Sequence, residues 1–93
     1  MSKTSVTLPE KLDIGCVANL KGRLEKALAK EATTIELNAA GVEVVDSSSI
    51  QLLLSFQNEV YNQGKEVQIV KSSDAMLSGS TLMGVDGLLA IEH

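Results

Sequence analysis

The sequence predicts a small α/β domain with a mixed four- to five-stranded sheet and helices mainly on one face. Some segments have apolar residues at every second position, which is the period of a strand, and others have them three or four residues apart, which is the period of a helix. The two kinds of segment alternate along the chain. The connections between them are short, and there are too few helices to cover two faces. The 93 residues, 44% of them hydrophobic, suffice for one core, so residues 1–93 form a single domain.

The first part of the chain predicts two short strands, a helix and a third strand. Residues 5–9 alternate and stop at Pro9, which cannot donate to a sheet, so they predict an edge strand. Residues 11–14 alternate again and predict a second strand, paired with the first as a hairpin. Leucines and alanines on one face predict an amphipathic helix over 17–30. The β-branched segment 33–38 predicts a third strand, parallel to an earlier strand of the same sheet.

A second helix is predicted after the β-like residues Val44 and Val45. Asp46 and the three serines that follow it are residues that commonly cap a helix, and Gly64 is a helix stop signal. The side that faces the core is predicted to consist of Ile50, Leu53, Leu54, Gln57, Val60 and Tyr61.

The last part of the chain predicts a fourth strand, a short helix and a terminal segment. Residues 66–70 alternate as a strand does. Residues 72–74 can cap a helix that reaches about residue 83 and stops at Gly84. We expect this helix to pack through Leu77, Leu82 and Met83. The apolar tail 88–91 predicts a last strand or a docked segment.

The composition excludes several classes of function. Eight basic residues against 12 acidic residues give a net charge of −4, and Phe56 and Tyr61 are the only aromatic residues, which argues against nucleic-acid binding. No apolar run approaches the ~20 residues that cross a bilayer. One cysteine and no signal-peptide pattern predict a cytoplasmic protein.

The residues for metal binding or catalysis are largely missing. His93 is the only histidine and stands at the last position, while Cys16 has no second cysteine near it. The serines at 47–49 have no internal histidine to act as their base. We therefore expect no metal, no cofactor and no catalytic residue.

One group of residues is a candidate functional site: the cluster of Asp46, Ser47, Ser48 and Ser49. Capping of the helix by itself accounts for an aspartate and a serine there. Three consecutive serines exceed what one cap requires. A phosphate in the first turn would meet free N–H groups and the positive end of the helix dipole, so phosphorylation at this position is compatible with the helix.

At these residues the sequence resembles the STAS family, the domain of bacterial anti-sigma factor antagonists. The similarity covers nearly the whole chain. It rests on four ordered segments: Leu37–Val42, Val45–Ile50, Gln51–Leu54 and Gly64–Val67. They are similar to the family's strand and turn, its D-S-[ST]-G-[LI] phosphorylation motif, its leucine-rich helix and its return to the sheet.

The resemblance implies a non-catalytic regulatory domain that is switched by phosphorylation. Ser47 aligns with the phospho-acceptor of the family, Ser48 and Ser49 are the alternatives, and Asp46 aligns with the motif's aspartate. Ser49 departs from the family, which normally has glycine there. Asp46, the three serines and Ile50 would form part of a partner-binding face, from which phosphate would repel the partner by its charge.

The implied partner is a protein: an anti-sigma factor with serine kinase activity, or another signalling protein. The chain itself would be a monomer or a weak dimer that acts in transcription regulation. STAS-like single domains also serve as regulatory subunits in chemotaxis-associated signalling and in phospholipid ABC transporters, and a subunit of that kind needs no phospho-switch. A small enzyme or a ligand carrier would instead need a pocket with converging polar groups, for which the sequence offers no second titratable cluster.

Overall fold

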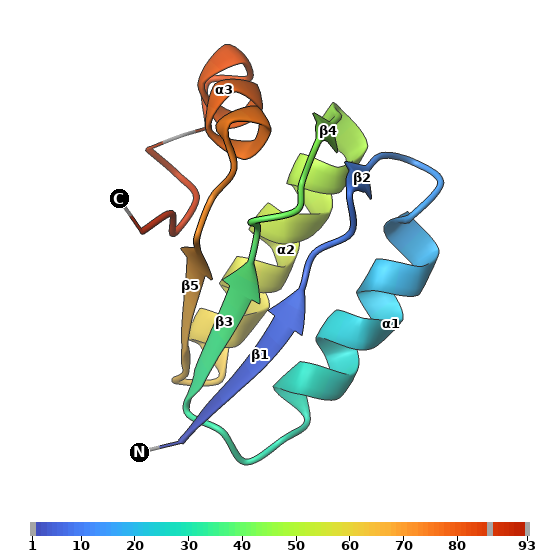
Figure 1. The fold of residues 1–93 in the computed structure, drawn as a ribbon. Coiled ribbons are helices and arrows are strands. Elements are labelled where there is room, and N and C mark those ends of the chain that lie inside the picture. Colours follow the sequence, from blue (N-terminus) through green and yellow to red (C-terminus); the bar gives the residue numbers. More distant parts are fainter. Residues whose placement is uncertain (1, 86, 93) are drawn as a thin grey trace.

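The computed structural model describes residues 2–85 and 87–92 (Figure 1). Three longer strands form a parallel sheet in the order β1-β3-β5, and two shorter strands form a separate parallel pair. The elements are β1 (Lys3–Thr7), β2 (Lys11–Leu12), α1 (Val17–Leu28), β3 (Thr34–Asn38), β4 (Val44–Val45), α2 (Ser47–Asn62), β5 (Glu66–Val70) and α3 (Asp74–Leu82). The predicted α/β class is confirmed.

The strand directions differ from the prediction. Every strand pair in the described residues is parallel, so the sheet is not mixed, and β2 pairs with β4 instead of forming a hairpin with β1. Figure 1 shows the reason: β2 continues beyond β1, and β4 beyond β3, without a reversal of the chain. Pro9 interrupts the first of these strands. The chain resumes pairing where the N–H groups of Glu43 and Val44 donate to the Glu10 carbonyl, at 2.7 and 3.0 Å.

One face of the main sheet is covered by α1 and α2, as Figure 1 shows. The strand residues on this face are buried: Val6, Ile35, Leu37, Val67 and Ile69. They pack against leucines of α1 and against the buried side of α2. Helices on one face agree with the prediction, and they explain why the strands alternate although the sheet is parallel.

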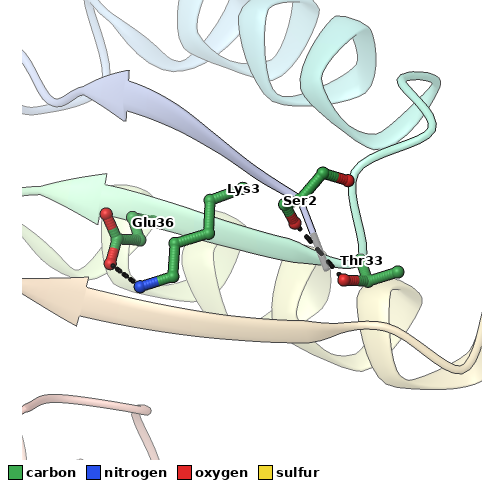
Figure 2. Close-up of polar contacts among 4 residues, drawn as sticks. All are labelled: Ser2, Lys3, Thr33 and Glu36. Atoms are coloured by element: carbon green, nitrogen blue, oxygen red, sulfur yellow. Dashed lines mark hydrogen bonds and ion pairs between the residues drawn. The ribbon is translucent and has the colours of Figure 1, made fainter.

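The opposite face of the sheet is polar. Lys3 and Glu36 form an ion pair across it at 3.5 Å, and the Thr33 hydroxyl donates to the Ser2 carbonyl at 3.3 Å where β3 begins (Figure 2). Alternation therefore places charged and hydroxyl side chains toward solvent on this face.

The helices begin and end close to the predicted signals. Gly64 and Gly84 have φ values of 74° and 71°, the left-handed conformation that glycine adopts without strain. The Ser73 hydroxyl caps α3 by accepting from the Met76 N–H at 3.1 Å. Helix α1 ends at Leu28, two residues before the expected end at 30.

Two side chains expected in the core are exposed instead. Tyr61 is 48% exposed, since Val60 takes the core position in the last turn of α2 and the next residue is rotated by about 100°. Leu82 is 87% exposed, because α3 packs through Met76 and Ser80 and Leu82 lies about 200° around the helix from Ser80.

The C-terminal tail is docked along β5. Ile91 forms a single parallel bridge with Ile69, and Leu89 is buried. The side chain of Gln57 on α2 holds the tail at two points, by donating to the Leu88 carbonyl and accepting from the Ala90 N–H, both at 2.8 Å. Of the two alternatives for residues 88–91, the structure has the docked segment.

Candidate functional site

The polar cluster lies where β4 passes into α2. Asp46 follows Val45 in extended conformation, with φ −122° and ψ 173°, and is the N-cap residue of α2. Its Oδ1 accepts from the Ser49 N–H at 2.9 Å, which satisfies one of the unpaired N–H groups of the first turn. The predicted capping role of Asp46 is thus observed.

Asp46 also connects parts of the chain that are far apart in sequence. Its Oδ1 accepts from the Ser48 hydroxyl at 2.7 Å, and its Oδ2 accepts from the N–H of Ile14 at 2.9 Å. Its own N–H donates to the carbonyl of Leu12 at 2.8 Å. The carboxylate therefore fixes the loop after β2 against the start of α2.

These hydrogen bonds favour the ionised carboxylate. The N–H of Ser49, followed by the hydroxyl of Ser48, lowers the pKa of Asp46 below its ordinary value of 3.8; burial opposes this and the Ile14 N–H adds to it. A negative charge is therefore held at the helix start at neutral pH.

The three serines have different surroundings. Ser47 is exposed, and Ser48 is half-buried with its hydroxyl on the Asp46 carboxylate. Ser49 is fully buried, and its hydroxyl contacts the Leu12 carbonyl at 2.6 Å and the Asp46 carbonyl at 2.9 Å. The hydroxymethyl group that replaces the family's glycine therefore points into the fold and leaves the surface unchanged.

Two residues expected at the partner-binding face lie beneath it. Ser49 is 0% exposed and Ile50 is 3% exposed, because in the first turn of α2 both face the core. The burial of Ser49 also disfavours it as a phosphorylation site, since its hydroxyl would have to leave two carbonyl acceptors. The accessible part of the cluster consists of Asp46, Ser47 and Ser48.

Two exposed apolar side chains near the cluster were not expected from the sequence. Ile14, whose N–H is bound by Asp46, is 73% exposed, and Val44 at the start of β4 is 45% exposed. The alternation of residues 11–14 had indicated that Ile14 is a strand residue; in the structure β2 ends at Leu12 and Ile14 lies in a turn. We call Ile14, Val44, Asp46, Ser47 and Ser48 together the α2-start surface.

The comparison with protein families agrees with this geometry. The family described as "Mlab, STAS domain" matches residues 2–90. The chain belongs to the STAS domain family. No curated protein sequence matches it significantly.

Two solved structures have the same fold as this STAS domain. The anti-sigma factor antagonist SpoIIAA in its unphosphorylated form is 18% identical, with a TM-score of 0.76 over 99% of this chain and 81% of the other. The NMR structure of the protein TM1081 is 19% identical, with a TM-score of 0.79 over 97% of this chain and 73% of the other. At these identities the similarity concerns the fold.

The single cysteine of this STAS domain is part of its packing. Cys16 is half-buried at the N-cap of α1 and packs against the core. Across residues 2–85 and 87–92, no three potential metal ligands come together, and no helix is long and apolar enough to cross a bilayer. His93 lies outside the described residues.

A groove of about 420 Å³ lies between α1 and α2. Leucines and Phe56 contribute its apolar lining, and Lys21, Glu25 and Glu59 contribute charged groups. This second titratable group was not expected from the sequence, because its members come from two helices. It shares no residue with the α2-start surface.

Proposed function

We propose that this STAS domain is a regulatory protein-interaction module, similar to the anti-sigma factor antagonists, that docks a protein partner through the α2-start surface. Phosphorylation of Ser47 switches the docking off. The observation that supports this proposal is an exposed serine in the first turn of a helix, next to an ionised aspartate that binds the N–H of the exposed Ile14 and follows the exposed Val44 by two residues. The partner is a serine kinase of the anti-sigma factor type or another signalling protein in a bacterial cytoplasm.

The switch follows from charge and hydration. The apolar Ile14 and Val44 supply area that a partner can bury, and Ser47 and Ser48 supply polar contacts around it. A phosphate adds a charge of about −1.5 to −2 beside Asp46, so a docked partner would have to desolvate two neighbouring anions. The N-terminus of α2 tolerates this charge, so the fold survives while the surface changes.

Ser48 is the alternative acceptor, and one contact favours it. Its hydroxyl donates to the Asp46 carboxylate at 2.7 Å, so this carboxylate is positioned to take the hydroxyl proton when the oxygen attacks a phosphoryl group. Ser47 is the more accessible of the two. Separate substitutions of the two serines distinguish them.

The experiment begins with a pull-down from the native cell, followed by mass spectrometry of the partner and of the peptide that contains residues 46–49. Calorimetry with the recovered partner then compares the wild type with Ser47→Asp and Ser48→Asp. We expect the substitution at the acceptor to weaken binding by about tenfold or more. Ser55→Asp, on the same helix but outside the cluster, is the matched control and should bind as the wild type does. Unchanged binding by both acidic variants would refute the proposal.

A second candidate function is a STAS subunit of a chemotaxis-associated system or of a phospholipid ABC transporter, without a phospho-switch. The observation that favours it is that Asp46, Ser48 and Ser49 are already engaged as a cap and as internal hydrogen-bond partners. Under this function the peptide recovered from cells carries no phosphate, Ser47→Ala has no effect in the cell, and partner binding still depends on Ile14.

A further inference from the structure

Among residues 2–85 and 87–92, no strand pairs with the outer edge of β1. The Ser2 carbonyl and the Leu8 N–H bond to β3 and its flanking residues, and the residues between them alternate in direction. The backbone N–H and carbonyl groups of the even-numbered residues of β1 thus point toward β3. Those of Lys3, Ser5 and Thr7 point to the free edge. The Thr7 carbonyl there accepts from the guanidinium of Arg23 at 2.7 Å.

Helix α1 and the residues directly after it place three cationic side chains along this edge. A cavity of about 190 Å³ between β1 and α1 is lined by Ser5, Val6, Ala27 and the cations Arg23, Lys26 and Lys30. Lys30 reaches the Thr4 hydroxyl at 3.4 Å. No acidic residue lines the cavity, although the chain as a whole carries a net charge of −4. We call the free edge of β1 with these three cations the basic edge.

We propose that the basic edge binds an acidic peptide segment of a partner protein, which adds to β1 as a further strand and directs acidic side chains at alternate positions toward Arg23, Lys26 and Lys30. The main chain of the segment would pair with the outward groups of Lys3 and Ser5 and with the Thr7 N–H, while the Thr7 carbonyl keeps its hydrogen bond from Arg23. This surface lies beside α1 and not at the start of α2 (Figure 1), so the inference is independent of the proposed function.

The dimensions of the two elements agree with this arrangement. From residue 23 to its last residue, Leu28, α1 rises about 7.5 Å, and Lys30 follows in the chain directly after the helix. Alternate side chains of a strand are about 6.6 Å apart, so two or three acidic residues at every second position extend over the same distance. Their carboxylates would form charge-assisted hydrogen bonds with the cations.

Two alternative roles of the basic edge lead to different outcomes. A second copy of this chain that paired β1 with β1 about a twofold axis would bring both sets of cations together, which charge repulsion opposes. Cations also occur at sheet edges only to prevent strand pairing. If the three cations only prevent strand pairing, no peptide binds.

The test uses a synthetic nonapeptide with glutamate at every second position and threonine between. Isotope-labelled protein is titrated with it and followed by NMR. We expect shifts of the backbone amides of Lys3, Ser5 and Thr7, slower amide exchange at Ser5 by about tenfold or more, and weaker binding at high salt. Peptides of the same composition with the glutamates clustered, and peptides with lysine in place of glutamate, should bind at least about tenfold more weakly.

Variants of the protein separate strand addition from general attraction of charge. The double variant Lys26→Glu/Lys30→Glu should lose binding, and Lys21→Glu, which changes a cation on another side of α1, should retain it. Ser5→Pro removes an outward N–H without removing a bond to β3, so the sheet should stay folded and binding should be lost. Circular dichroism checks folding; if Ser5→Pro is unfolded, the comparison of the alternating with the clustered peptide decides.

Three results would overturn the inference. The first is the absence of any amide shift in β1 at peptide saturation. The second is equal binding of the alternating and clustered peptides, which would mean attraction of charge without strand addition. The third is binding of anionic phospholipid vesicles through Lys26 and Lys30 in place of the peptide.

Discussion

At the scale of single residues, the carboxylate of Asp46 has two structural tasks and one electrostatic consequence. It caps α2 and holds the N–H of Ile14, so it determines both the start of a helix and the position of an exposed apolar side chain. The hydrogen bonds that do this also keep the group ionised. A partner that binds the α2-start surface would therefore contact a negative charge whose position is fixed by the fold.

The lowered pKa of Asp46 predicts how stability depends on pH. Because the folded value lies below the ordinary value of 3.8, the ionised group stabilises the fold above that pH, and the contribution is lost as the pH falls through the lowered pKa. Asp46→Asn removes this contribution, since its amide nitrogen cannot accept from Ile14. We expect the difference in Tm between wild type and variant to be largest near pH 7 and to shrink below about pH 4. Thermal unfolding followed by circular dichroism measures it; a constant difference would contradict the prediction.

Because the hydroxyl of Ser49 is buried and hydrogen-bonded, its removal should lower the free energy of unfolding more than removal of the exposed hydroxyl of Ser47. Ser49→Ala removes the hydrogen bonds to the carbonyls of Leu12 and Asp46. Ser47→Ala makes the same chemical change at an exposed position in the same helical turn, so differences in helix propensity largely cancel. We expect Ser49→Ala to be less stable than Ser47→Ala by about 1 kcal/mol in urea unfolding. Equal stability would mean that the hydroxyl of Ser49 contributes nothing.

At the scale of elements, α3 approaches β4 closely because it has a glycine at the contact. A Cβ atom at Gly79 would lie 3.0 Å from the Cβ of Val45. Gly22 in α1 has no atom within 4 Å of the corresponding position. The two glycines are both inside helices but differ in what surrounds them, which makes them a matched pair.

Substitution of the two glycines should therefore have different effects. Gly22→Ala should raise the free energy of unfolding by about 0.5–1 kcal/mol, because alanine favours the helix. Gly79→Ala should raise the free energy of unfolding less, or lower it, because its methyl group would lie too close to Val45. In a Val45→Gly background, which removes the Cβ that the new methyl group meets, the effect of Gly79→Ala should approach that of Gly22→Ala. Urea unfolding of the single and double variants measures this; equal gains at both glycines in the wild-type background would contradict it.

At the scale of the whole molecule, the fold is a sheet with two helices on one face, and its C-terminal tail is fastened to that assembly by a side chain of α2. Gln57 makes both hydrogen bonds to the tail, and the Glu92 N–H donates to the Ile69 carbonyl at 2.9 Å. The tail adds to the buried surface through Leu89. The side chain of Gln57 thus couples the tail to α2, and backbone hydrogen bonds at Ile69 couple the tail to the sheet.

Gln57→Ala should release the tail from this assembly. We expect faster amide hydrogen exchange at Ala90 and Glu92, by about tenfold or more, with a smaller change in the centre of the sheet. Gln51→Ala, at an exposed position on the same helix, is the control and should leave the exchange unchanged. Equal exchange in the two variants would show that Gln57 does not hold the tail.

Features that depend on residues near one another in the chain could be predicted from the sequence. The spacing of leucines indicated α1, alternation indicated β3 and β5, and Gly64 and Gly84 marked helix ends, because hydrogen bonding and burial within one element repeat with a short period. The start of α2 at the serine cluster was predicted for the same reason, since a cap involves residues three positions apart.

Contacts between distant segments were decided only by the tertiary structure. The pairing of β2 with β4, the inward direction of Ser49 and the exposure of Ile14 depend on how residues 12 to 14 meet residues 44 to 49. The basic edge likewise forms only when α1 returns along β1. The sequence by itself determined the elements and the chemistry available at the start of α2. Which of those groups reach the surface was decided by packing, because burial depends on what the rest of the chain brings to the other side.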